Sequence, residues 1–149
     1  MRSTDGGNKW EGAIISPNIP SEKNPDVFGN PMPACNRGAM CEGKDGRIYW
    51  AVIANNADSV INTSLHLLTS DDKGMTWEYA CPVAKHETIY FTETSLYQTP
   101  KGYLVAFMRT ANYDDYACIV RSTDGGKSFG QWESMGFKGL PLAAVKLTG

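Results

Sequence analysis

One short pattern, Ser-x-Asp-x-Gly-x-x-aromatic, occurs three times in the 149 residues of this chain. The copies span residues 3–10, 70–77 and 122–129. A match to four fixed positions has a chance of roughly 10⁻⁵ per starting residue at average residue frequencies. Three copies in so short a chain therefore indicate a true internal repeat, and the fold must be built from repeated units.

The pattern predicts a tight turn that contains its own hydrogen bonds. The carboxylate of the central aspartate (Asp5, Asp72 or Asp124) can accept hydrogen bonds from N–H groups of the turn, and the glycine supplies a positive φ. We expect the aromatic ring to fold back between strands and to seal the unit. The three aspartates are therefore assigned a structural role and not a catalytic one. We call the three segments the Asp turns.

The spacing of the Asp turns predicts a β-propeller. Successive aspartates are 67 (72 − 5) and 52 (124 − 72) residues apart, which is close to the length of a four-stranded blade with its loops. The fold class that we predict is all-β, a fragment of a propeller with about two whole four-stranded blades and two partial ones. Each Asp turn then marks one blade.

Strand patterns divide the chain into four parts. We expect a blade end at residues 1–16, a blade at 35–85, another blade at 90–135 and the start of a further blade at 139–149, with a Pro-rich connection at 17–33. The expected strands are 11–16, 37–43, 47–54, 63–69, 78–84, 91–99, 103–110, 116–121, 131–135 and 140–147. These parts cannot close a ring, so we expect the remaining blades to be missing from this chain.

Composition and charge exclude several classes of protein. The chain has 42% hydrophobic and 20% charged residues and a formal net charge of −2, as an ordinary globular protein does. Its Lys and Arg residues are scattered, so we expect no nucleic-acid partner. No apolar run approaches the ~18–20 residues that span a bilayer, and we expect no membrane segment. No signal peptide follows Met1, the first residues already belong to a turn, and no localisation is predicted.

The four cysteines give no sign of a metal centre. Cys35, Cys41, Cys81 and Cys118 form no CxxC pair and have no histidine at zinc-ligand spacing. We therefore predict no metal site and no cofactor. Cys118 lies in an apolar run and is expected to be a small buried residue. A Cys35–Cys41 disulfide is left open.

The hairpin turns predict which charged residues share one end of the blades. In the 90–135 blade the turn centres near Lys101, so residues whose numbers sum to about 202 face each other, and Glu93 pairs with Arg109. In the 35–85 blade the turn centres near Asp45, which places Arg37 at the level of Glu93. Strand alternation sends the Asp turns to the opposite end. We call the end that holds Arg37, Glu93 and Arg109 the charged rim.

Two loops are also expected at the charged rim, residues 55–62 with Asp58 and residues 111–115 with Asp114. Functional residues gather on such loops above a rigid scaffold. Arg37, Asp58 and Asp114 are therefore candidate substrate-binding residues, and the alternative is that they are solvated surface charges. For Glu93 and Arg109 the alternative to a functional role is an ordinary cross-strand ion pair.

The segment from Glu93 to Arg109 resembles a blade of the sialidase (neuraminidase) superfamily, whose repeats are known as BNR repeats or Asp-boxes. It reads Glu93-x-Ser95, then Gly102-x-Leu104, then Arg109, and an Asp turn follows. The resemblance implies a six-bladed propeller and a glycoside hydrolase. It also implies that Glu93 partners a tyrosine nucleophile and that Arg109 is one of three arginines that bind the sialic acid carboxylate. Glu93 and Arg109 are therefore the candidate catalytic residues.

Two functions fit the sequence. In the first, the full-length protein is an exo-α-sialidase-like hydrolase that removes terminal sialic acid from glycans with retention. A tyrosine nucleophile suits that reaction, because a carboxylate nucleophile would be repelled by the carboxylate of the substrate. The nucleophile belongs to a later blade in the family, so this stretch alone is expected to be inactive. In the second, the protein is a non-catalytic propeller that binds a glycan or a protein.

Overall fold

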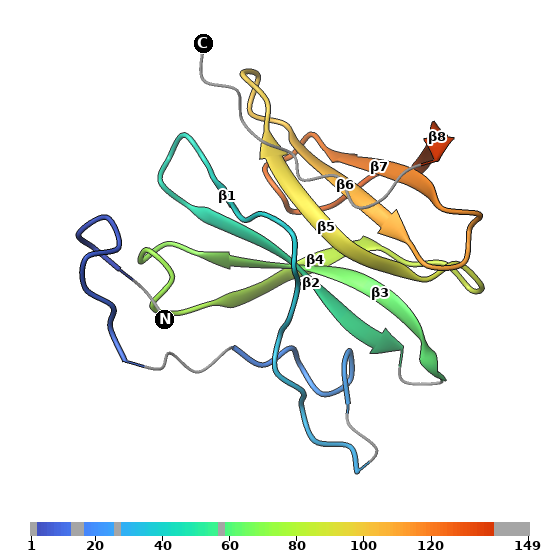
Figure 1. The fold of residues 1–149 in the computed structure, drawn as a ribbon, viewed down its shortest axis with the longest axis horizontal. Helices are drawn as coiled ribbons and strands as arrows, with labels where there is room; N and C mark the ends of the chain where they lie inside the picture. Colours follow the sequence, from blue (N-terminus) through green and yellow to red (C-terminus); the bar gives the residue numbers. More distant parts are fainter. Residues whose placement is uncertain (1–2, 13–16, 26–27, 57–58, 139–149) are drawn as a thin grey trace.

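The computed structural model describes residues 3–12, 17–25, 28–56 and 59–138 (Figure 1). These residues form eight strands: β1 (Cys41–Glu42), β2 (Ile48–Asn56), β3 (Ser59–Ser70), β4 (Glu78–Ala84), β5 (Phe91–Gln98), β6 (Leu104–Thr110), β7 (Tyr116–Ser122) and β8 (Glu133–Lys138). The strands pair antiparallel in two four-stranded sheets, β1-β2-β3-β4 and β5-β6-β7-β8.

The all-β prediction is confirmed for the described residues, which contain strands and no helix. None of them therefore belongs to a helix that could span a membrane. The two sheets lie side by side and do not close a ring (Figure 1).

Most strands lie where the sequence predicts them, and β4 has the predicted bounds. The main exception is the strand expected at 37–43, of which only Cys41–Glu42 pairs with β2. Upstream of it a single bridge joins Cys35 to Ile53. The long first strand was a wrong prediction, because residues 36–39 direct several hydrogen bonds to β5 of the other sheet. The strands expected at 11–16 and 140–147 fall largely or wholly outside the described residues.

The predicted registers of the two hairpins are confirmed. Cys41 faces Tyr49 across the turn at Asp45. Thr94 faces Met108, and the same register continues to the turn near Lys101. The register shifts between Phe91 and Thr94, at the end of β5 that holds Glu93.

The second Asp turn contains the hydrogen bonds that the sequence predicts. Asp72 Oδ1 accepts bonds from the backbone N–H groups of Met75 at 2.9 Å and Thr76 at 2.8 Å. Ser70 Oγ donates to the same carboxylate and accepts the N–H of Gly74. The hydroxyl and N–H of Thr76, followed by the hydroxyl of Ser70, hold the pKa of Asp72 down at about 2. Both carboxylate oxygens are thus engaged in the turn.

The other two Asp turns repeat this arrangement. Asp124 Oδ1 accepts the N–H groups of Lys127 and Ser128, each at 3.0 Å, and Asp5 Oδ1 accepts the N–H of Lys9 at 2.8 Å. The glycine of each pattern has the expected positive φ; the values are 91° at Gly7, 83° at Gly74 and 87° at Gly126. The hydrogen-bonding role predicted for the three aspartates is confirmed.

The aromatic residue of the pattern seals two of the three turns. Trp77 packs against a buried cluster, with its ring centroid 5.4 Å from that of Trp50, and Phe129 packs against the main core. The sealing role predicted for Trp10 was wrong, because 61% of this residue is exposed in the part of the chain that the structure describes. Its ring has no described sheet beneath it to pack on.

The main core lies between the two sheets. Side chains from β2, β3 and β4 meet side chains from β5, β6 and β7, and they include Tyr49, Ala51, Leu65, Leu67, Leu96, Leu104, Ala106, Met108 and Val120. The buried Cys118 lies in this core, as predicted. All four cysteines are free thiols, so no Cys35–Cys41 disulfide is formed.

The third Asp turn inserts into the contact between the sheets. A Cβ placed on Gly126 would lie 2.9 Å from Leu67 of the first sheet and 3.0 Å from Leu104 of the second. Gly125, the preceding residue, also has a positive φ but has nothing within 4 Å of the equivalent position. Gly126 therefore combines a conformational requirement with a steric one.

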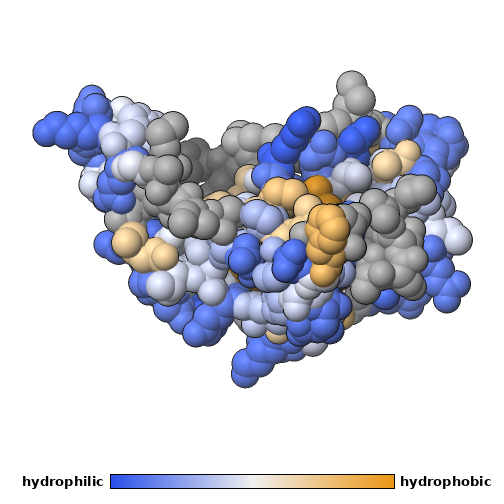
Figure 2. Space-filling view, turned by 90° about the horizontal axis from the view of Figure 1, so that it is seen from below, coloured by the Kyte–Doolittle hydropathy of each residue, from blue (hydrophilic) through white to orange (hydrophobic). Residues whose placement is uncertain are grey.

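The opposite face of the first sheet is covered by the N-terminal arm, which we define as the described part of residues 17–35. Ile19 and Ala34 of the arm are buried against Val52, Ala54 and Leu68. The arm runs along the lower side of this sheet in Figure 1. The face seen from below that view is mostly hydrophilic, with a small group of hydrophobic side chains near its middle (Figure 2).

His66 of β3 is buried on the face that the N-terminal arm covers. Its Nε2 lies 2.9 Å from Ser64 Oγ and its Nδ1 lies 3.1 Å from the Tyr79 hydroxyl. Burial, reinforced by the positive charges of Lys23 and Lys85, lowers the pKa of His66 from 6.5 to about 4. The imidazole is therefore neutral at pH 7.

The steric role of Gly126 can be tested against its neighbour. Gly125→Ala is expected to lower the free energy of unfolding by about 1–2 kcal/mol, the cost of a left-handed alanine. Gly126→Ala is expected to cost about 1–3 kcal/mol more, because its Cβ overlaps two core leucines. Urea unfolding of both variants measures the difference. Equal losses would show that the third Asp turn is not wedged between the sheets.

The burial of His66 predicts a loss of stability in mild acid. The unfolded chain takes up a proton near pH 6.5, whereas the folded chain resists it down to about pH 4. The free energy of unfolding therefore keeps its full value above about pH 6.5 and decreases as the pH falls towards 4. Between pH 7.5 and 5.5 this amounts to about 1.3 kcal/mol. His66→Gln should remove this part of the pH dependence in urea unfolding, and an unchanged pH dependence would contradict the assignment.

Candidate functional site

Glu93 and Arg109 meet at the charged rim, at the end of the β5–β6 hairpin away from its turn. Arg109 Nη1 donates a hydrogen bond to Glu93 Oε2 at 3.0 Å. The side chains are 33% exposed for Arg109 and 21% exposed for Glu93. The prediction that these two side chains are neighbours is confirmed, and the pair remains accessible from solvent.

Glu93 is held in its ionised form. Partial burial is the largest single influence and would raise its pKa, but it is outweighed by hydrogen bonds. These come from its own backbone N–H and from Arg109, and the charge of Arg109 adds to them. The pKa of Glu93 therefore lies below its ordinary value. At neutral pH this carboxylate can accept a proton.

Two threonines anchor the strand on either side of Glu93. Thr92 Oγ1 donates to the backbone carbonyl of Arg109 at 3.3 Å, which ties the two strands together where their register shifts. Thr94 is 1% exposed and its hydroxyl donates to the carbonyl of Thr92 at 3.0 Å. The backbone beneath Glu93 is thus fixed by both neighbours.

Arg109 has donors to spare. A guanidinium carries five N–H groups, and one nitrogen of Arg109 is bonded to Glu93. Its guanidinium makes no other hydrogen bond to the residues that the structure describes. A planar fork with free N–H groups suits a carboxylate ligand.

The other candidates differ in position. Arg37 is exposed and lies between Asn36 and Gly38, both of which contact Thr94 beside Glu93, so it reaches the predicted level of the rim. Asp58 lies outside the described residues.

Asp114 is not joined to the Glu93–Arg109 pair in the described structure. It forms an ion pair with Lys138 of β8, its side chain is 71% exposed, and its φ of 51° places it in a tight left-handed turn. Asp114 therefore sits in a loop at the outer strands, with a partner of its own.

Sequence reasoning missed Asn36 and Gly38, which link the two sheets beside Glu93. Asn36 lies just after the Pro-rich connection at 17–33, Gly38 falls within the strand expected at 37–43, and neither has a pattern of its own. Their partner Thr94 is 58 residues from Asn36 in the sequence. Only the spatial neighbourhood of the two sheets could have revealed them.

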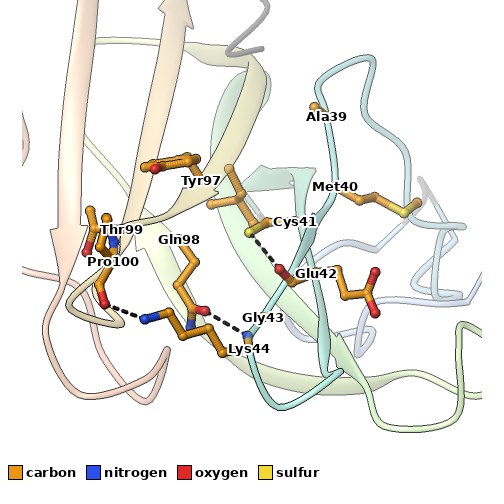
Figure 3. A pocket seen from close by; sticks show the side chains of 11 residues that line it. Ala39, Met40, Cys41, Glu42, Gly43, Lys44, Tyr97, Gln98, Thr99 and Pro100 are labelled. Atoms are coloured by element: carbon orange, nitrogen blue, oxygen red, sulfur yellow. Dashed lines mark hydrogen bonds between the residues drawn. The ribbon is translucent and has the colours of Figure 1, made fainter. Parts of the chain in front are cut away.

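A hollow of about 620 Å³ lies between β1 and β5 on the side of the hairpin turns (Figure 3). It is bounded near the turns by Lys44, whose N–H donates to Gln98 Oε1 at 2.9 Å and whose ammonium donates to the carbonyl of Pro100. Tyr97 and Cys41 also contribute to its wall. Glu93 and Arg109 do not line this hollow, so it is separate from the charged rim.

Comparisons with known proteins place the chain among repeat proteins. A family model described as a BNR repeat-like domain matches residues 1–146. The chain is 55% identical to a protein of unknown function from Dyadobacter fermentans DSM 18053, with a TM-score of 0.88 to its crystal structure. The match covers 97% of this chain and 40% of that protein, so the chain spans two fifths of its length.

A more distant similarity is to the Hadza microbial sialidase Hz136. The identity is 22% and the TM-score is 0.49, over 60% of this chain and 16% of that one. No curated protein matches the chain.

We expect the Glu93–Arg109 pair to contribute little to stability. A double-mutant cycle with Glu93→Gln and Arg109→Met should give a coupling energy of about 0–1 kcal/mol, because both side chains are partly solvated. The exposed cross-strand pair Arg121–Glu133 on the same sheet serves as the reference. Urea unfolding measures both cycles. A coupling energy of about 3 kcal/mol or more for Glu93–Arg109, but not for the reference pair, would show that the Glu93–Arg109 pair mainly stabilises the fold.

Proposed function

Because the chain belongs to the BNR repeat-like domain family, we propose that it forms part of an exo-α-sialidase-like glycoside hydrolase on a six-bladed β-propeller. The two sheets are two of its blades, and further blades complete the ring. The substrate is a glycan that ends in sialic acid. The remaining catalytic groups come from parts of the propeller outside this chain.

The observation that carries the proposal is the contact between Glu93 and Arg109 at the charged rim. The proposal gives the two residues complementary tasks on one substrate, a proton acceptor and a carboxylate binder. The antiparallel topology puts the hairpin turns and Asp turns at the other end of the sheets. The structural carboxylates are thus kept away from the proposed site.

Arg109 would bind the carboxylate of sialic acid. Sialic acid carries this group on its anomeric carbon, next to the bond that is cleaved, and a guanidinium can bind it through two parallel N–H bonds. The unused donors of Arg109 suit this task. Arg37 is proposed as a second cation at the same rim, from the neighbouring sheet.

Glu93 would accept the phenol proton of a tyrosine nucleophile. A phenol with a pKa near 10 is a weak nucleophile at neutral pH, and an adjacent ionised carboxylate makes it reactive. Glu93 is ionised at neutral pH, as a group that accepts this proton must be. Arg109, which bonds both Glu93 and the proposed substrate carboxylate, would hold them in a fixed relation.

Asp114 and Asp58 are the loop aspartates of the proposed site. Asp114 would reach a substrate only after it separates from Lys138, a surface pair that costs little to break. Asp58 is proposed from the sequence as a further rim residue.

The alternative function is a non-catalytic propeller that binds a glycan or a protein through the same rim. It is favoured by the direct ion pair, since Glu93 and Arg109 bond each other as ordinary cross-strand partners do. A binding module would retain its ligand unchanged. Release of product therefore separates the two functions.

We expect the full-length protein to release sialic acid from a fluorogenic α-sialoside. Glu93→Gln should lower kcat at least ~10²-fold, because it removes the proton acceptor. Arg109→Ala should lower kcat/KM about 10–100-fold through the loss of charged hydrogen bonds. Arg121→Ala, which removes an exposed arginine of the same sheet, should leave the rate unchanged.

Circular dichroism and thermal unfolding must show that each variant is folded. No release by the parent protein, together with glycan binding that Glu93→Gln leaves intact, would favour the binding module. Equal rates for parent, Glu93→Gln and Arg109→Ala would remove both residues from the mechanism.

A further inference from the structure

Asn36 uses its whole side-chain amide to join the two sheets. Its Nδ2 donates to the carbonyl of Ala51 in β2 at 2.5 Å and to the carbonyl of Thr94 in β5 at 2.8 Å. Its Oδ1 accepts the N–H of Gly38 at 3.0 Å and the N–H of Thr94 at 3.2 Å. Two donors and two acceptor positions are all that an asparagine amide offers, so every one of them is used.

The bonds to Thr94 replace those of a missing strand partner. Thr94 faces Met108 of β6 across one edge of β5, and its other edge points towards the first sheet. On that edge the Asn36 amide takes both the N–H and the carbonyl of Thr94, as a neighbouring strand would. The carbonyl of Ala39 accepts the N–H of Leu96 two residues further along, at 3.1 Å.

Gly38 brings the first sheet close enough for these bonds. A Cβ on Gly38 would lie 1.6 Å from the carbonyl oxygen of Thr94 and 2.9 Å from the N–H nitrogen of Ser95. No side chain fits at this distance, so glycine is required by the close backbone approach. The residues on either side of Arg37 are thus both committed to the backbone of β5.

The peptide held by Asn36 is the one that links Glu93 to Thr94. Its N–H is the donor to Asn36 Oδ1, so the hydrogen bond is made at the nitrogen two bonds away from the Cα of Glu93. The ladder between β5 and β6 is irregular here, with a register shift between Phe91 and Thr94. The Asn36 amide, which also bonds β2 of the first sheet, adds a further tie to the backbone where the ladder is irregular.

We propose that Asn36 is a positioning residue for Glu93, which sets the distance of its carboxylate from Arg109 by clamping the Glu93–Thr94 peptide from the neighbouring sheet. The role of this positioning in catalysis rests on the proposed function. The clamp itself is a property of the fold. It makes the geometry of a site on the second sheet depend on a side chain of the segment that leads into the first.

The test compares two asparagines that each accept a backbone N–H. Asn36→Ala removes the clamp, and Asn24→Ala is the matched control, since buried Asn24 accepts the N–H of Asn55 at 2.8 Å in the contact between arm and sheet. Both variants of the full-length protein should lose stability. Only Asn36→Ala should speed hydrogen exchange at the Thr94 amide and raise the pKa of Glu93 towards its ordinary value. A ¹³C NMR titration of the Glu93 carboxyl group measures that pKa.

Kinetics on the α-sialoside form the second readout. Asn36→Ala should lower kcat by roughly 10²-fold with little change in KM, because it misplaces the base without removing the carboxylate binder. The acid limb of its pH–rate profile should move to higher pH. Asn24→Ala should keep the parent kcat and acid limb. If Asn36→Ala does not fold, Asn36→Ser is used instead, because its single hydroxyl cannot make the four hydrogen bonds of the amide, and the same measurements apply.

The outcomes separate the two hypotheses. A Glu93 titration and a Thr94 exchange rate equal to those of the parent would overturn the positioning role, whatever the activity. Equal losses of kcat in the Asn24 and Asn36 variants would overturn it too, since they would reflect general destabilisation. A parent protein inactive on the sialoside, with the Glu93 titration shifted only by Asn36→Ala, would reject the proposed function and support the clamp.

Discussion

The Asp turn carboxylate is the constraint on which the rest of the structure depends. An aspartate that accepts two backbone N–H groups and bonds two hydroxyl groups, as Asp72 does, fixes the link between the third and fourth strands of a sheet without help from distant residues. The turn then determines which strand ends lie together. The charged rim is placed at the far end of the sheets by the same alternation. The third turn does more, because Gly126 also fills the space between the sheets.

The features that could be predicted from the sequence are those set by local spacing. The Asp turns, the hairpin registers and the contact between Glu93 and Arg109 all depend on residues at most 16 positions apart. The short β1 could not be predicted, because its usual hydrogen bonds are replaced by bonds from Asn36 to Thr94 across 58 positions. The pairing of Asp114 with Lys138 was missed for a similar reason, since it needs the bend between β7 and β8.

The two kinds of carboxylate in this chain show how one residue type serves two purposes. Asp72 and Asp124 are exposed, yet their oxygens are engaged by hydroxyl and N–H donors of their own turn, and their pKa values are strongly lowered. Such a group uses most of its hydrogen-bonding capacity within its own turn. Glu93 is also ionised, but burial opposes its charge and its partner Arg109 has other donors free. The candidate site is therefore distinguished by hydrogen-bond donors of Arg109 that remain free within the described structure, and not by charge alone.

Family membership and the proposed function therefore rest on different residues. The BNR repeat-like match extends over residues 1–146, and the Asp turns that repeat along this stretch specify the scaffold. A propeller can keep that scaffold while its rim changes, since the turns and the rim lie at opposite ends of the strands. What ties the rim to the scaffold is the Asn36 clamp beside Glu93. A relative that retains the Asp turns but lacks an equivalent of this clamp would keep the fold and lose the fixed geometry of the pair.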